Sequence, residues 1–246
     1  MKNKKAKTIL MILFAVILIG SIVFGYIFFN GLSGIRLNPK YQEGQIKVAL
    51  VGDSVTYGHS IKNWPKNNYP SLLSDSLGDK YCVKSYGVSG CTVQPDGDQA
   101  YNATKAYQWS HEFEADILVF MLGSNDSKPE NWKGTEKFKE EYLELLTTYT
   151  EVENPPVVLL CTPPTAYFAE GVTEGLSNYD VQPAIIEEIA EIVRDVAGDK
   201  GYTLIDVNDL TENKRELFGK DNVHPNNDGA EAIASVVYDF IKNIGE

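Results

Sequence analysis

Cysteine is scarce in this chain, with three among 246 residues. No two of them follow a C-x-x-C spacing, so the sequence gives no indication of a zinc site or a thiol-redox site. The sequence leaves open whether Cys82 and Cys91 form a disulfide or whether both, like Cys161, are buried thiols.

Basic residues are also few, because 22 Lys and Arg stand against 34 Asp and Glu and give a formal net charge of −12 at pH 7. Six of the basic residues lie within residues 1–42, which hold no acid, so the rest of the chain carries 16 basic and 34 acidic residues. Such an acidic domain repels polyanions, and we expect no nucleic acid among its partners.

Charge is absent from residues 8–29, a stretch long enough to cross a hydrocarbon core of about 30 Å as a helix. Four lysines precede this stretch, and no acid follows it until Glu43. The pattern predicts a cytoplasmic basic tail (1–7), a transmembrane signal anchor (8–29), a linker (30–44) and a domain (45–246) held outside the cytoplasm at the cell membrane. Cleavage as a signal peptide, which would yield a secreted protein, stays open.

Short apolar runs alternate with helical patterns through the rest of the chain. The runs are Gln45–Val51, Lys80–Tyr86, Asp116–Leu122, Val157–Cys161 and Tyr202–Val207. Alternation of this kind predicts one α/β domain, a three-layer α/β/α sandwich with a five-stranded parallel sheet covered by helices on both faces.

The first apolar run ends in Gly52-Asp53-Ser54, which brings a serine to the carboxyl edge of the sheet, where open α/β sheets carry their chemistry. Alone, this serine would more often be a helix cap. A serine nucleophile needs an imidazole to take its proton and a carboxylate to orient that imidazole. Asp221 lies three residues before His224, so its carboxylate can fold back onto the ring. We therefore predict Ser54 as nucleophile, His224 as base and Asp221 as its orienting acid.

Acyl transfer also needs hydrogen-bond donors for the developing oxyanion. The backbone N–H of Ser54, the backbone N–H of Gly87 and the side-chain amide of Asn125 are predicted to serve, since all three follow strand ends. Taken alone, Gly87 would be a turn glycine and Asn125 a helix cap; their combination with Ser54 and His224 favours the oxyanion hole.

In four stretches between residues 45 and 245 the chain resembles the SGNH (GDSL-type) hydrolase superfamily. The stretches are Gly52-Asp53-Ser54, Gly87, Gly123-x-Asn125-Asp126 and Asp221-x-x-His224. The resemblance implies a flavodoxin-like fold, the same triad and oxyanion hole, and no requirement for a metal or cofactor. Val55 departs from the Leu that gives the GDSL motif its name, but this side chain takes no part in the triad chemistry.

Three stretches, two of which contain motifs already named, look like the sialate O-acetylesterase-like branch of that superfamily. They are Gly-Val-Ser-Gly, Met-Leu-Gly-Ser-Asn-Asp-Ser-Lys-Pro and Leu-Cys-Thr-Pro-Pro. This resemblance implies a serine esterase that removes O-acetyl groups from carbohydrate through an acyl-enzyme. The alternatives are a lysophospholipase or thioesterase of the same superfamily, an inactive carbohydrate-binding domain, and a flavodoxin-like binder of a phosphorylated ligand.

Other polar and aromatic residues receive plainer interpretations. Asp53 and Asp126 are expected to hold motif loops through backbone N–H groups, and His59 and His111 are expected to be surface or structural residues. Five aromatic side chains in or near predicted loops could stack on a sugar, although most such residues fill the core or rim: Trp64, Tyr101, Trp109, Trp132 and Tyr167.

Overall fold

The structure, a computed structural model, describes residues 11, 13–21, 38–168, 171–172 and 174–244. Within these residues no helix is long and apolar enough to cross a membrane, so the predicted transmembrane helix over residues 8–29 is wrong. The other residues of the predicted span and most of the predicted linker lie outside the described residues.

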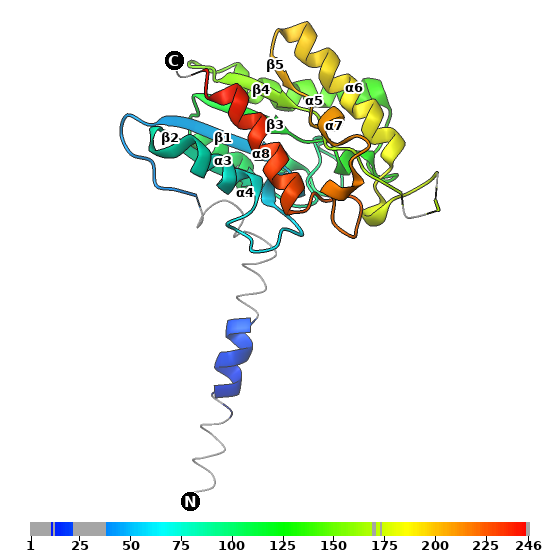
Figure 1. The fold of residues 1–246 in the computed structure, drawn as a ribbon, viewed down its shortest axis with the longest axis horizontal. Helices are drawn as coiled ribbons and strands as arrows, with labels where there is room; N and C mark the ends of the chain where they lie inside the picture. Colours follow the sequence, from blue (N-terminus) through cyan, green and yellow to red (C-terminus); the bar gives the residue numbers. More distant parts are fainter. Residues whose placement is uncertain (1–10, 12, 22–37, 169–170, 173, 245–246) are drawn as a thin grey trace, which may run out of the picture.

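Five parallel strands form one sheet in the order β2-β1-β3-β4-β5. They are β1 (Ile46–Gly52), β2 (Tyr81–Gly87), β3 (Ile117–Met121), β4 (Val157–Cys161) and β5 (Thr203–Ile205), and Figure 1 shows them at the centre of the domain. The strand order reverses direction between β1 and β3, and open α/β sheets bind ligands at the carboxyl ends of the strands beside such a point.

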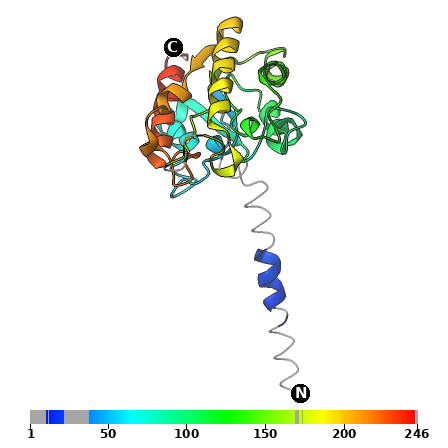
Figure 2. The same cartoon turned by 90° about the vertical axis from the view of Figure 1, so that its right-hand side faces the viewer.

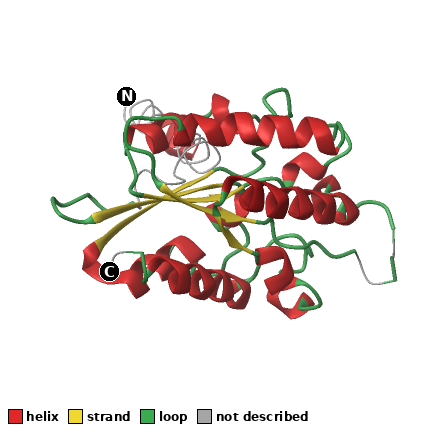
Figure 3. Cartoon of the chain, turned by 90° about the horizontal axis from the view of Figure 1, so that it is seen from above, coloured by secondary structure: helices red, strands yellow, loops and turns green. Residues whose placement is uncertain are grey.

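Helices cover both faces of the sheet, as Figures 2 and 3 show. On one face α4 (Lys105–Glu112), α5 (Thr135–Thr150) and α6 (Pro183–Lys200) pack against Ala49 and Val51. On the other face α3 (Tyr69–Leu77) and α8 (Asn227–Ile241) pack against Val48 and Leu50. Alternate residues of β1 therefore enter opposite halves of the core, as the pleat of a strand requires.

Shorter elements lie between these layers and along their ends. They are the helices α2 (Ser54–Tyr57) and α7 (Val207–Thr211) and the 3₁₀ turns η1 (Gly78–Lys80), η2 (Tyr101–Ala103), η3 (Asn125–Ser127), η4 (Asn178–Asp180) and η5 (Arg215–Leu217). The five-stranded parallel sheet and its two helical layers agree with the prediction from the sequence.

The three cysteines, Cys82, Cys91 and Cys161, are all buried free thiols. Cys82 and Cys91 are therefore not joined by a disulfide.

Candidate active site

Ser54 is the first residue of α2 and lies immediately beyond the carboxyl end of β1. The buried Asp53 carboxylate caps this short helix by accepting a hydrogen bond from the N–H of Val55 at 2.9 Å. Gly52 is required at the strand end, because a Cβ there would lie 2.7 Å from the carbonyl oxygen of Met121. These local constraints hold the Ser54 hydroxyl at the carboxyl edge of the sheet.

His224 connects Ser54 to Asp221. Its Nε2 lies 2.9 Å from Ser54 Oγ, and its Nδ1 lies 3.0 Å from Asp221 Oδ2. The other carboxylate oxygen accepts hydrogen bonds from the backbone N–H of Val223 at 3.1 Å and of His224 at 2.9 Å. Burial raises the pKa of the Asp221 carboxyl, but the hydrogen bonds from His224 and Val223 outweigh burial, so this pKa lies well below its usual range. The carboxylate is charged and fixed toward the ring.

A cavity of about 130 Å³ opens at Ser54 and is lined by His224, Gly90 and Asn125 among others. The Asn125 side-chain amide donates one hydrogen bond to the Cys91 carbonyl at 3.0 Å, which fixes its orientation. Because an amide nitrogen carries two N–H groups, the second can serve a bound oxyanion. Gly90 adopts φ +83°, a left-handed conformation that favours glycine, at the wall of the same cavity.

Gly87, the predicted second oxyanion donor, does not line this cavity. It ends β2, where a Cβ would lie 2.3 Å from the backbone nitrogen of Tyr57 and 2.6 Å from the carbonyl carbon of Thr56. The glycine is therefore required for the close packing of α2 against β2. Within the Gly-Val-Ser-Gly stretch the last two residues, Ser89 and Gly90, line the Ser54 cavity, and neither was predicted as a site residue.

Two further rings pack against His224. The ring centroid of His59 lies 4.4 Å from that of His224, and the ring of Tyr179 meets it edge-on at 5.1 Å. Both side chains line the Ser54 cavity, and the expectation that His59 is a surface or structural residue stays a prediction. Burial lowers the pKa of His59, and a charge on His224 lowers it further, while Asp221 raises it. The position of His59 five residues after Ser54 was the available signal, whereas the segment around Tyr179 carries none.

The five aromatic residues considered as sugar platforms do not line the Ser54 cavity. Trp64 packs on Tyr57 with ring centroids 5.0 Å apart, and the buried Tyr101 hydroxyl donates to the Tyr86 carbonyl at 2.8 Å. His111 stacks on Tyr149 at 4.0 Å, so its structural interpretation is confirmed.

Asp53 and Asp126 hold motif loops, as predicted. The Asp126 carboxylate accepts hydrogen bonds from the N–H groups of Val93 and Gln94 at 3.0 Å each, which ties the loop after β2 to the turn after β3. Burial raises the pKa of Asp126 to about 7, although these backbone hydrogen bonds lower it, and burial also raises the pKa of Asp53.

No group of three or more His, Cys, Asp or Glu side chains that could hold a metal ion occurs within the described part of the chain.

Comparison with known proteins gives the family. The profile of the GDSL-like lipase/acylhydrolase family matches residues 50–232. A protein named acetylxylan esterase, from Xylanibacter ruminicola, is 32% identical over an alignment of 222 residues that covers 83% of this chain and 45% of that protein. The chain thus spans less than half the length of this relative.

Solved structures share the fold at low sequence identity. Est24, a carbohydrate acetylesterase from Sinorhizobium meliloti, has a TM-score of 0.64 at 17% identity. The match covers 81% of this chain and 100% of the Est24 chain. The aryl esterase of M. smegmatis has a TM-score of 0.65 at 16% identity, with 80% and 99% of the two chains covered. The chain belongs to the GDSL-like lipase/acylhydrolase family. Its predicted place in the SGNH hydrolase superfamily is confirmed.

Proposed function

We propose that this chain is a serine esterase that removes small acyl groups, acetyl above all, from carbohydrate. The observation that supports it most directly is the position of His224, with one ring nitrogen 2.9 Å from Ser54 Oγ and the other 3.0 Å from Asp221. A neutral imidazole so placed can take the hydroxyl proton, while the carboxylate fixes its tautomer and stabilises the imidazolium.

The reaction proceeds in two half-reactions. Ser54 Oγ attacks the ester carbonyl as its proton passes to His224 Nε2, and a tetrahedral intermediate forms. Its collapse breaks the bond to the alcohol oxygen, which takes the proton from His224, and leaves the acyl group on Ser54. A water molecule then attacks the acyl-enzyme with His224 again as base, and the acid leaves as Ser54 recovers its proton.

The oxyanion hole in this proposal consists of the Ser54 N–H, the Gly90 N–H and the second N–H of the Asn125 amide. Gly90 replaces Gly87 because Gly90 lines the Ser54 cavity and Gly87 packs against α2. Donors fixed before the reaction stabilise the negative charge that develops on the carbonyl oxygen, and losing one typically costs about 10²- to 10³-fold in kcat.

The size of the cavity favours a short acyl group. Its volume of about 130 Å³ is well below the roughly 300–1,000 Å³ of sites that enclose a whole drug-sized ligand. An acetyl group would enter, while a long acyl chain would need a further apolar cleft, so a lysophospholipase or thioesterase is disfavoured.

The carbohydrate part of the proposal is supported by the printed names of the relatives, an acetylxylan esterase and a carbohydrate acetylesterase. The alcohol part of the ester would lie outside the small cavity, beside the exposed ring of Tyr179, which is 53% accessible.

Location of the domain outside the cytoplasm stays a prediction from the sequence, which cell fractionation would check.

Hydrolysis of p-nitrophenyl acetate, butyrate and octanoate by the purified chain tests this function. We expect turnover to fall steeply with acyl length and to be lost in both Ser54→Ala and His224→Ala, with circular dichroism spectra unchanged. Release of acetate from acetylated xylan or acetylated oligosaccharides would then identify the sugar. A preference for octanoate would contradict the short-acyl proposal, and activity retained in Ser54→Ala would contradict the assignment of the nucleophile.

A further inference from the structure

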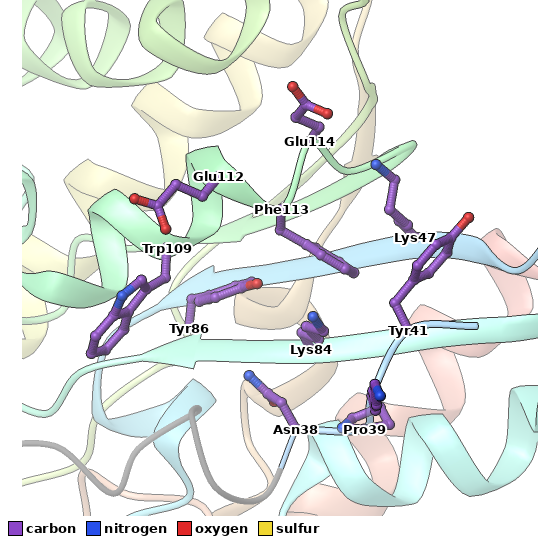
Figure 4. A pocket seen from close by; sticks show the side chains of 11 residues that line it. Asn38, Pro39, Tyr41, Lys47, Lys84, Tyr86, Trp109, Glu112, Phe113 and Glu114 are labelled. Atoms are coloured by element: carbon purple, nitrogen blue, oxygen red, sulfur yellow. The ribbon is translucent and has the colours of Figure 1, made fainter. Parts of the chain in front are cut away.

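A second and larger cavity lies along the free edge of the sheet. Its volume is about 610 Å³, within the range of small-molecule sites, and it shares no lining residue with the Ser54 cavity. We call it the edge cavity and define it by Tyr41, Lys47, Lys84, Tyr86, Trp109 and Phe113, which Figure 4 shows between β1, β2 and α4.

Lys84 occupies an unusual position on the edge strand β2. Its neighbours at alternate positions, Cys82 and Tyr86, face the same side of the sheet and are buried in the core on that side, whereas Lys84 is half-buried. A lysine on a core-facing side of a sheet brings its ammonium group into apolar surroundings, where charge is costly unless it finds a partner.

The partner that Lys84 has is an aromatic ring rather than a carboxylate. Its Nζ lies 4.1 Å from the ring centroid of Phe113, and Nζ of Lys47, on the adjacent strand, lies 5.8 Å from the same centroid. Neither lysine is within 4.0 Å of an acidic oxygen anywhere in the described ranges. Two ammonium groups therefore converge on one ring in a protein of net charge −12.

Aromatic side chains form the two ends of the cavity. Trp109 projects from α4 at one end, and Tyr41, which is 40% exposed, lies at the other end beside Lys47. The backbone at Tyr41 is held near β2 because the Asn38 side chain donates to the Ser85 carbonyl at 2.9 Å and accepts from the Ser85 N–H at 2.7 Å. The cavity thus combines two ammonium groups with ring faces at either end.

We propose that the edge cavity binds an acidic saccharide, with a uronate carboxylate between Lys47 and Lys84 and a sugar ring against Trp109 or Tyr41. An ammonium group forms strong charge-assisted hydrogen bonds with a carboxylate, and the apolar face of a sugar ring packs on aromatic rings. Glu112 and Glu114, also at the cavity wall, offer acceptors for sugar hydroxyls. That the ligand is a saccharide rests on the proposed carbohydrate substrate, while the anionic ligand rests on the lysines alone.

Calorimetric titration of the full chain with three probes tests this site: trigalacturonate, neutral xylotriose and benzoate. We expect trigalacturonate to bind, xylotriose to bind at least about tenfold more weakly, and added salt to weaken binding of trigalacturonate. Lys84→Met and Lys47→Met should each weaken the binding of trigalacturonate about tenfold, and Trp109→Ala should weaken it by a similar factor. The matched control is Lys105→Met, which removes an exposed lysine of α4 that does not line the cavity.

The outcomes separate this inference from the proposed function. Equal affinity for xylotriose and trigalacturonate would contradict the role of the lysines. Binding of benzoate alone would contradict the saccharide as ligand. If none of the three probes binds, the edge cavity is not a binding site. Hydrolysis of p-nitrophenyl acetate, which should be unchanged in both lysine variants, verifies that they are folded. If the lysine variants lose trigalacturonate binding but still hydrolyse the ester, the proposed site in the edge cavity is supported. If the original chain binds trigalacturonate but hydrolyses no ester, only the proposed function is contradicted.

Discussion

Ser54 and His224 stand 170 positions apart, yet their side chains share one hydrogen bond at the carboxyl edge of the sheet. The partner on the other side of the ring is local, since Asp221 and His224 belong to one turn in which the Asp221 carboxylate accepts a hydrogen bond from the backbone N–H of His224. The Asp221–His224 contact could therefore be predicted from a three-residue spacing, whereas the contact with Ser54 required the whole fold.

Replacing Asp221 with Asn is expected to lower the free energy of unfolding by about 2 kcal/mol at pH 7, because hydrogen bonds to a charged group are lost. The pKa of this carboxyl is lower in the folded than in the unfolded chain, so its stabilisation is complete above the unfolded value of about 3.9 and is lost as pH falls toward the folded value. Urea unfolding between pH 7 and pH 3 gives the free energy of unfolding of the original chain and of Asp221→Asn. The two values should differ by a constant amount above about pH 5, and the difference should narrow below about pH 4. A difference independent of pH would contradict this account.

Tyr179 is the exposed aromatic ring at the mouth of the Ser54 cavity. Replacing it with Ala should raise KM for an acetylated xylo-oligosaccharide about threefold to tenfold more than KM for p-nitrophenyl acetate, since ring packing contributes about 0.5–1.5 kcal/mol. Tyr179→Phe keeps the ring and should keep the KM. Equal effects on both substrates would show that Tyr179 acts through His224 rather than on the sugar.

At the scale of secondary structure, α2 can lie close to β2 only because Gly87 has no side chain. Gly87→Ala is therefore expected to lower the free energy of unfolding by about 2–4 kcal/mol, as overpacking against backbone atoms cannot be relieved by a rotamer change. Urea denaturation measures the effect. Gly198→Ala is the matched control, because a Cβ there meets nothing within 4 Å and should leave stability unchanged or raise it.

The five strands and the five long helices could be predicted because apolar runs and helical periodicity are strong local signals. The short helices α2 and α7 were missed, since four and five residues are too few to show a period. The predicted transmembrane helix rested on length, lack of charge and the preceding lysines, and the described residues contain no helix long and apolar enough to cross a membrane.

Gly87 and Gly90 show where prediction of the site from the sequence stops. Both belong to one Gly-Val-Ser-Gly turn, and the sequence does not say which glycine faces the serine. Their roles depend on the path of the backbone after β2, which hydrogen bonds from Val93 and Gln94 to Asp126 hold in place. Such long-range constraints leave no periodic pattern.

For the whole molecule, two of the cavities along the sheet differ in their chemistry. The Ser54 cavity of about 130 Å³ lies at the carboxyl edge, and the edge cavity of about 610 Å³ lies beside β2. In our account the first holds the acyl group during hydrolysis, and the second holds an acidic sugar of the same polymer. Activity on small aryl esters should therefore depend on the first cavity alone.

Covalent labelling of Ser54 tests the central claim most directly. The full chain would be treated with diisopropyl fluorophosphate, which modifies activated serines, and examined by intact-mass and peptide mass spectrometry. We predict one label per chain, on Ser54, no label in Ser54→Ala, and much slower labelling in His224→Ala. A label on a different residue, or equally fast labelling of His224→Ala, would contradict a serine nucleophile activated by His224.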